Sequence, residues 1–510
     1  MTAAQPPRAT LRTLDEIKTY LAESPQPIFY ISRSATNLLG VDRVVGGFRY
    51  VTLSDSWDGA HPNAFAPTNV PKLEPRGNLN VVNWLLANDQ VQAYIRRSTP
   101  AGYTPQVVIS MFDEESERLC RELGYELIMP PVRLRERLDS KIVTTQIGND
   151  AGAQSVPNIL TTVSGWDDLR EQAAAAGLGD DLVVQLPYGD SGRTTFFVTS
   201  QADFDRVAGE ISGGGSAAPE IKVMRRINHR SFAADAVITR AGTVVGPVLR
   251  EITGHPELTQ YKGGWAGSEL YPGLISEQTR QRAVSLVQRF SDRLAEEGYR
   301  GTLGIDLLVD TDSGEVYLGE LNPRITGSAS HSNLQGLSTT PATGREATDA
   351  QTTLPMFAYH VLEYSGADFE LDLDEIQAER GRALDGQTWS TLVIQHQRPA
   401  TERTDVAPRT GRYRIGAGGS LEFLSPDLDW QEIDEPDEAF WFRSSGPGEI
   451  VSRGVDIGML ITRRRSQEEH HALNAETKRL IPSLLGKYEG KRLPTIQLYW
   501  RAGLRRLRGE

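Results

Sequence analysis

The sequence predicts a mixed α/β and α+β fold in three domains, and three observations lead to this prediction. Residues 1–135 alternate short apolar segments with helical ones, which is typical of an open α/β domain. Residues 136–370 contain apolar hairpins joined by flexible, glycine-containing loops. Residues 371–510 are a series of short alternating segments before a helical stretch and a basic tail. We therefore expect an N-terminal α/β domain, a central domain, and a C-terminal β-rich domain.

Composition agrees with a large protein that works on small molecules. The chain has 510 residues, 39% of them apolar, and a net charge of −13. This charge argues against a nucleic-acid-binding surface, although arginines at 501–508 form a local basic end. Cys120 is the only cysteine, which excludes an internal disulfide and suits a reducing cytoplasm. No apolar run approaches the roughly 20 residues of a membrane span, so we expect no membrane association.

In the first domain, the pattern predicts strands at 27–31, 107–111 and 125–129 and helices at 81–95 and Glu114–Leu123. The polar run that follows the first strand, 32–37, lies at a carboxyl edge, where α/β sheets often bind ligands. It could equally be an ordinary turn. In the last domain we expect strands at 389–395, 412–415, 420–423, 439–442, 448–451 and 458–462, followed by one helix over 466–485.

The most informative segment is residues 301–327, GTLGIDLLVDTDSGEVYLGELNPRITG. Two apolar strands, 303–309 and 315–320, flank a turn-forming sequence and therefore predict an antiparallel hairpin. Side chains alternate along a strand, so Glu320 and Asn322 share a face, and pairing brings Asp306 near them. Carboxylate and amide oxygens suit Mg²⁺, with Mn²⁺ as an alternative, and Arg324 adds a guanidinium for phosphate. A solvated acidic hairpin is the simpler alternative.

This pattern, an acidic residue on one strand followed by E-x-N-x-R on the next, resembles the final metal-binding element of the ATP-grasp superfamily. The resemblance implies that Asp306, Glu320 and Asn322 bind metal ions beside the phosphates of ATP. It also implies a catalytic role for Arg324. The central domain would then be an ATP-grasp domain, with its lid over about 141–225.

Other segments resemble the nucleotide-binding parts of that superfamily in chain order. Lys141 opens a helix and resembles the first nucleotide lysine, and 154–158, QSVPN, resembles the turn before the lid. The lid loop then follows a strand at 181–187 and returns at 196–198. Its glycines would let backbone N–H groups approach phosphate, and its hydroxyls would add donors. The loop residues expected to bind the nucleotide are Gly189, Ser191, Gly192 and Thr194.

One position departs from the superfamily pattern. Most members carry a second lysine on the lid strand, where this chain has Gln185. An amide can still bond phosphate or adenine but lacks the charge, so either Arg193 or Lys222 would supply the missing positive field. Loss of ATP use is the other interpretation.

The segment 222–228 resembles the hinge that receives the adenine edge. Arg225 and Ile227 would bind through their main chain, and Met224 would pack on the base. In the next strand, 231–238, Asp235 either turns toward the site or faces solvent. Arg250 ends a predicted strand over 243–250 and precedes a flexible insertion, 251–269.

Two further side chains carry alternatives. Arg250 either holds the γ-phosphate or an acyl phosphate, or forms a surface salt bridge. His331, in the segment after Arg324, is a candidate base, whereas His396 and His470 carry weaker expectations.

The resemblance implies an ATP-dependent carboxylate–amine ligase that joins a carboxylic acid to an amine, such as an amino acid or peptide, through an acyl phosphate. ADP and phosphate are the other products. Residues 451–460, VSRGVDIGML, and the helix after them resemble the C-terminal domain of the biotin-carboxylase-like branch, in which homodimers are common. The segment 325–333 lacks that branch's bicarbonate and biotin pattern, so a carboxylase is the second interpretation. A nucleotide-binding scaffold without turnover is the third.

Overall fold

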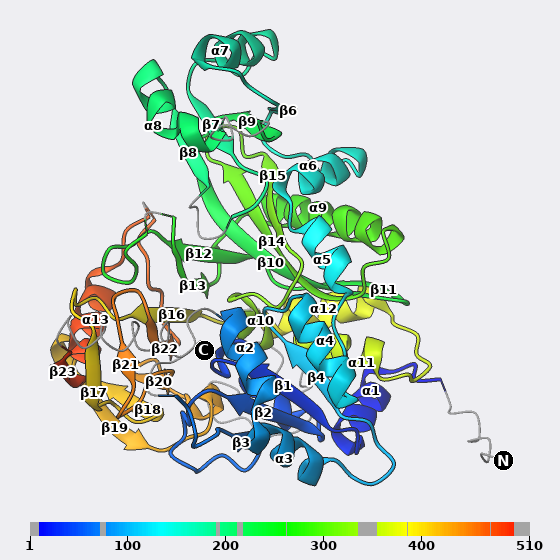
Figure 1. The fold of residues 1–510 in the computed structure, drawn as a ribbon, viewed down its shortest axis with the longest axis vertical. Helices are drawn as coiled ribbons and strands as arrows, with labels where there is room; N and C mark the ends of the chain where they lie inside the picture. Colours follow the sequence, from blue (N-terminus) through cyan, green and yellow to red (C-terminus); the bar gives the residue numbers. More distant parts are fainter. Residues whose placement is uncertain are drawn as a thin grey trace, which may run out of the picture.

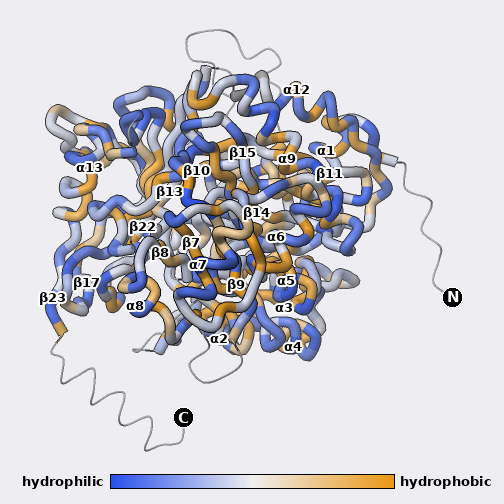
Figure 2. The backbone as a smooth tube through the Cα atoms, turned by 90° about the horizontal axis from the view of Figure 1, so that it is seen from above, coloured by the Kyte–Doolittle hydropathy of each residue, from blue (hydrophilic) through white to orange (hydrophobic). Residues whose placement is uncertain are grey.

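The computed structural model describes residues 10–71, 78–189, 194–211, 218–261, 263–334, 354–384, 386–469 and 471–493. Within these ranges it is a mixed α/β structure, as the sequence predicts (Figure 1). Hydrophobic stretches concentrate in the interior, and hydrophilic ones lie mainly at the periphery (Figure 2). None of the described helices is both long and apolar enough to cross a membrane.

The N-terminal part is a five-stranded parallel sheet in the order β3-β2-β1-β4-β5. Its strands are β1 (Ile28–Ser32), β2 (Phe48–Thr52), β3 (Ala64–Phe65), β4 (Gln106–Ile109) and β5 (Glu126–Leu127). Its helices are α1 (Leu14–Glu23), α2 (Asn78–Ala87), α3 (Asp89–Ser98), α4 (Glu114–Leu123) and α5 (Val132–Leu138). The predicted open α/β arrangement is confirmed.

The single helix expected over 81–95 is wrong, because the chain forms two helices there. Asn88 separates α2 from α3, and its side chain accepts hydrogen bonds from the N–H groups of Gln90 and Val91. An asparagine in this position caps the first turn of the following helix.

The four-stranded antiparallel sheet in the order β6-β9-β7-β8 forms the lid region, at the top of Figure 1. Its strands are β6 (Asn158–Thr161), β7 (Leu182–Gln185), β8 (Thr195–Val198) and β9 (Ile221–Arg225). Its outer face packs under α7 (Trp166–Ala175) and α8 (Gln201–Ile211) in one hydrophobic cluster. The predicted lid hairpin is confirmed as β7 and β8, and α6 (Lys141–Asp150) precedes the sheet.

The largest sheet has eleven strands and continues from the central part into the C-terminal part. Its order is β15-β14-β10-β12-β13-β16-β22-β20-β18-β19, and β11 pairs with β10. The central strands are β10 (His229–Thr239), β11 (Gly242–Val245), β12 (Leu249–Thr253), β13 (Trp265–Leu270), β14 (Gly301–Asp310) and β15 (Val316–Asn322). The later ones are β16 (Trp389–Gln395), β18 (Gly411–Ile415), β19 (Leu421–Ser425), β20 (Glu438–Arg443) and β22 (Asp456–Thr462).

The expected strand over 243–250 is wrong, since Gly246 and Pro247 interrupt it between β11 and β12. Helix α9 (Glu277–Glu296) covers one face of the central strands. Helix α11 (Met356–Tyr364) joins this sheet to the N-terminal one within a shared hydrophobic core. Helix α12 (Leu373–Leu384) follows.

The C-terminal part also has a three-stranded sheet of β21 (Ile450–Val451), β17 (Glu402–Val406) and β23 (Glu489–Arg492). The expected helix over 466–485 is partly wrong, because α13 spans only Ala475–Leu485. Residues 466–469 and 471–473, the described part of the 466–473 loop, lie outside any helix, and the N–H groups of Ser466 and Gln467 donate to Glu269 of the large sheet. The basic tail lies outside the described residues.

Candidate functional site

Strands β14 and β15 form the predicted antiparallel hairpin, with β15 reaching Asn322. Asp306 lies directly opposite Glu320, and Asn322 lies opposite Gly304. Directly opposed residues point to the same face of a sheet, so all three predicted metal ligands share one face. The Asn322 Nδ2 donates to Asp306 Oδ1 at 3.3 Å. The structure therefore brings these side chains together.

Two basic side chains partly offset the charge of this group. Lys141 Nζ donates to Glu320 Oε1 at 2.6 Å, and Arg324 Nη2 donates to Asn322 Oδ1 at 2.9 Å. Burial, followed by the neighbouring Glu320 carboxylate, raises the pKa of Asp306 to about 7, although Lys141 and Arg324 act in the opposite direction. Two partly buried carboxylates this close favour a bound cation.

Glu251 is a third carboxylate near this group, and the sequence analysis did not identify it. Ala233 on β10 lies opposite both Asp306 and Leu249, so Glu251, two residues further along β12, shares their face. Burial and the carboxylates of Asp306 and Glu320 raise the pKa of Glu251 well above its usual range. The expected flexible insertion at 251–269 is wrong, because its ends belong to β12 and β13. Their pairing with β10 and β16 is a long-range contact that local composition does not reveal.

The lid sheet turns a second group of side chains toward these residues. Val183 pairs with Met224, and Gln185 pairs with Lys222, so these four share one face. The alternate residues of the same strands, including Val184 and Val223, lie in the cluster under α7 and α8.

Lys222 is buried on this face, and Lys141 and Glu320 both interact with it electrostatically. Burial and then Lys141 lower the pKa of Lys222 to about 8, while Glu320 acts in the opposite direction. Gln185 Nε2 donates to Thr195 Oγ1 at 3.1 Å. Gln185 Oε1 is buried and has no hydrogen-bond partner within the described part of the chain.

An apolar cluster lies between the lid sheet and the large sheet, next to these charges. Val183 and Met224 come from the lid, and Leu308 and Tyr317 come from β14 and β15. Leu308 pairs with Tyr317 two residues beyond Asp306. Val156 and Ile227 complete the cluster. We call the facing surfaces of these two sheets the cleft; they are apolar near the hinge and charged near Arg324.

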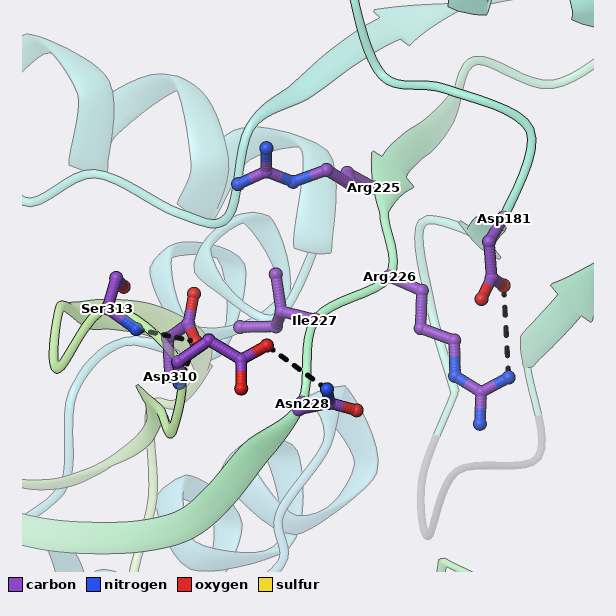
Figure 3. A pocket seen from close by; sticks show the side chains of 8 residues that line it. Asp181, Arg225, Arg226, Ile227, Asn228, Asp310 and Ser313 are labelled. Carbon is purple, nitrogen blue, oxygen red and sulfur yellow. Dashed lines mark hydrogen bonds and ion pairs between the residues drawn. The ribbon is translucent and has the colours of Figure 1, made fainter.

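The hinge after β9 borders a cavity of about 500 Å³ (Figure 3). Its lining residues are Asp181, Arg225, Arg226, Ile227, Asn228, Asp310, Asp312 and Ser313. Asn228 Nδ2 donates to Asp312 Oδ2 at 3.1 Å, which ties the hinge to the β14–β15 turn. Arg226 pairs with Asp181 on the lid side at 3.8 Å. The expected main-chain partners, Arg225 and Ile227, both line this cavity.

The lid loop is described only at its ends. Gly189 has a φ of +154°, and a Cβ there would come within 2.0 Å of Thr194 Oγ1, so this position requires glycine. The Gly189 carbonyl accepts a hydrogen bond from Lys141 Nζ at 3.1 Å. Ser191, Gly192 and Arg193 lie outside the described residues. The lid loop is therefore tied to the first predicted nucleotide lysine.

Arg250 does not form the surface salt bridge that was one interpretation. It is 2% exposed, and its Nη1 lies 3.4 Å from Glu269 Oε1 in a buried pair. Its Nη2 donates to the Glu469 carbonyl at 3.3 Å. Glu269 also accepts from the N–H groups of Ser466 and Gln467, at 2.8 and 3.2 Å. Arg250 thus joins β12 to the 466–473 loop.

Asp235 is fully buried, so the solvent-facing interpretation is wrong. It accepts hydrogen bonds from the hydroxyls of Thr326, Ser328 and Ser332 and so holds the segment that follows Arg324. Burial raises its pKa.

His331 lies in α10 (Ala329–Leu334) and is also fully buried, with its Nδ1 3.3 Å from Ser268 Oγ. Burial lowers the pKa of His331 to about 3, which does not suit the expected role as a base near neutral pH. His396 is buried too, and His470 is not among the described residues.

No protein-family model matches the chain, and no curated protein matches it either. Solved structures do match. A biotin carboxylase from Campylobacter jejuni, in complex with a β,γ-ATP compound, is 12% identical with a TM-score of 0.58, covering 92% of each chain. The biotin carboxylase domain of the Hydrogenobacter thermophilus 2-oxoglutarate carboxylase, a dimer with MgADP and bicarbonate, is 12% identical with a TM-score of 0.57. That match covers 92% of this chain and 91% of the other.

A third match is N5-carboxyaminoimidazole synthase from Aspergillus clavatus, in complex with ADP and 5-aminoimidazole ribonucleotide. It is 13% identical, with a TM-score of 0.51, and covers 90% of this chain and 99% of the other. Identities this low establish the fold alone. The chain has an ATP-grasp, biotin-carboxylase-like fold.

Proposed function

We propose that this protein is an ATP-dependent carboxylate–amine ligase. The observation that carries the proposal is the cleft between the lid sheet and the large sheet, which is apolar at the hinge and charged at Arg324. A nucleotide has the same polarity, with an aromatic base at one end and a polyphosphate at the other. We therefore orient the nucleotide with its base at the hinge and its phosphates near Arg324.

The base would lie among Met224, Val183 and Leu308 and bond to the main chain of Arg225 and Ile227. Gly189, Thr194, Ser191 and Gly192 would cover the phosphates through backbone N–H and hydroxyl groups. Lys141 would exchange its bond to Glu320 for one to phosphate. Gln185 would donate its amide to the same region.

The donor set at the charged end suits Mg²⁺. No group of three or more His, Cys, Asp or Glu side chains placed to hold a metal ion occurs in the described ranges. Asp306, Glu320 and Asn322 would therefore supply part of the coordination, and phosphate oxygens and water the rest, as is usual for Mg²⁺. Bound there, Mg²⁺ would neutralise phosphate charge during phosphoryl transfer.

In the proposed reaction, an oxygen of the acid attacks the γ-phosphorus, the bond to ADP breaks, and an acyl phosphate forms. The amine nitrogen then attacks the acyl carbon, phosphate leaves, and the nitrogen loses a proton. Arg324 would stabilise the charge on the transferring group. Arg250 could reach the acyl phosphate only by breaking its buried pair with Glu269. A closed lid would exclude water from the acyl phosphate.

A biotin-dependent carboxylase is the second candidate, and the carboxylases among the structural matches favour it. One of these structures is a complex with MgADP and bicarbonate. A nucleotide-binding scaffold is a third, favoured by Gln185. For the ligase, the acid and amine would be amino acids or peptides, and the protein could work as a homodimer.

ADP release separates these candidates. The purified chain is incubated with ATP, Mg²⁺ and pools of amino acids or dipeptides, and condensation products are identified by mass spectrometry. ADP release that requires both an acid and an amine supports the ligase. Release that requires bicarbonate and biotin contradicts it in favour of the carboxylase. Nucleotide binding without release in any pool contradicts both enzymes.

A further inference from the structure

We propose that Lys222 is a second phosphate-binding lysine of the cleft, and that it takes the place of a cation at Gln185 from the neighbouring strand. This inference rests on the proposed nucleotide site. It goes further by assigning the buried amine on β9 to the nucleotide rather than to the lid's own packing.

The direction of the Lys222 side chain is the first step. Along β9, Ile221 and Val223 lie in the cluster under α7 and α8, whereas Met224 lies in the cluster of the cleft. Side chains alternate along a strand, so Lys222 shares the cleft face with Met224. Its ammonium group is therefore on the side of the proposed nucleotide and away from the lid's core.

The electrostatic neighbours of Lys222 are the second step. Lys141 approaches the cleft from α6 and Glu320 from β15, and both interact with Lys222 across the cleft. Lys222 is only 2% exposed, so water does little to screen its repulsion from Lys141. Glu320 already accepts a hydrogen bond from Lys141. One carboxylate shared by two buried ammonium groups leaves excess positive charge, which a polyphosphate would offset.

The pairing between β7 and β9 explains why the positive charge can come from either strand. Gln185 and Lys222 are directly paired between β7 and β9. Opposed residues have their Cβ atoms only about 5 Å apart, so a lysine side chain from either position can reach the same region. The Gln185 Oε1 atom is buried without a hydrogen-bond partner in the described ranges. The region that the Lys222 side chain reaches therefore has unused hydrogen-bonding capacity.

Four variants test this inference: Lys222→Gln, Lys222→Met, the exchange Gln185→Lys with Lys222→Gln, and the control Lys478→Gln on an exposed face of α13. Binding of Mg·ADP is measured by calorimetry, and binding of adenosine, which lacks phosphates, is measured by ligand-observed NMR. We expect both single Lys222 variants to bind Mg·ADP about 10- to 100-fold more weakly, the cost of a lost charged hydrogen bond. Adenosine binding should not change. The exchange variant should recover most of the ADP affinity.

Other outcomes overturn the inference. Unchanged ADP affinity in Lys222→Gln and Lys222→Met would remove Lys222 from the phosphate site. An equal loss of ADP and adenosine binding, together with a lower melting temperature, would show a purely structural role. If the exchange variant binds Mg·ADP as weakly as the single variants, a lysine at position 185 cannot replace Lys222, and the two positions do not serve the same phosphate site. If the unmodified protein fails to bind Mg·ADP, the proposed function itself falls, whereas the first three outcomes leave it intact.

Discussion

Two acidic sites in this molecule, one buried and one partly buried, differ in how completely their charges are satisfied. Glu269 accepts from Arg250, from two backbone N–H groups and from the Gln467 side chain. Asp306 and Glu320 instead lie opposite each other, with one lysine and one amide as hydrogen-bond donors. A saturated carboxylate, one whose oxygens all accept hydrogen bonds, holds elements of the fold together. An undersaturated pair, which has fewer donors than its oxygens can accept, can still bind a cation that arrives with a ligand. We therefore expect mutations at the first site to affect stability and mutations at the second to affect function.

The largest effect should follow from Glu320→Ala. Loss of this carboxylate removes a metal ligand and the partner of Lys141, so we expect turnover to fall by about a thousandfold or more. The free energy of unfolding should change little. The measurement is ADP release with the identified substrates, alongside urea unfolding.

Glu315→Ala is the matched control, because this glutamate lies beside the same hairpin but is exposed and pairs only with Arg282. Full activity in Glu320→Ala would show that the metal assignment is wrong.

Glu269→Ala should have the opposite profile. It leaves Arg250 buried without its counter-ion and frees several donors of the 466–473 loop, which costs about 3–5 kcal/mol of unfolding free energy. Urea unfolding followed by tryptophan fluorescence measures this loss. Nucleotide affinity of the remaining folded protein should stay near its original value. If Glu269→Ala is as stable as the original protein but no longer binds Mg·ADP, the Glu269 site is functional rather than structural, and its partner Arg250 belongs to the catalytic site.

His360, a buried histidine whose two ring nitrogens both have hydrogen-bond partners, should make the stability of the protein depend on pH in the acid range. His360 accepts from the Thr302 N–H and donates to the Ile128 carbonyl, and burial lowers its pKa to about 4. Below pH 6.5 the unfolded chain binds a proton that the folded chain does not, so stability falls as the pH decreases toward 4. The expected slope from this residue is about 1.4 kcal/mol per pH unit.

His360→Gln should lower stability at neutral pH but remove this part of the slope, as measured by urea unfolding between pH 7 and pH 4. An unchanged slope would show that folding does not lower the pKa of His360.

The smallest effect should come from the lid loop. Gly189→Ala introduces a Cβ against Thr194 and disturbs the carbonyl that binds Lys141, so we expect Mg·ADP affinity to fall about five- to tenfold. Gly165→Ala, which has open space around the new Cβ, is the control in the same lid. Equal affinities of these two variants would contradict a role for the Gly189 segment in nucleotide binding.

The undersaturated site was more predictable from sequence than the saturated one. Asp306, Glu320 and Asn322 lie within one hairpin, so alternation and turn chemistry suffice to bring them together. Glu269 and Ser466 are far apart in the chain, and only tertiary pairing explains why 466–473 is a loop rather than the start of α13. Glu251 was missed for the same reason, since its face depends on the register of β12 with β10. The break at Asn88 was different, because the capping residue was visible in the sequence.

The ladder between β13 and β16 has a practical consequence for dissecting this protein. Both strands belong to one continuous sheet, so a fragment that stops near residue 370 would expose the backbone edge of β13. The fragment would also lack the 466–473 loop, whose backbone groups form hydrogen bonds with Arg250 and Glu269. Such open edges recruit other chains, so the fragment that ends near residue 370 should aggregate unless a replacement strand is grafted onto it.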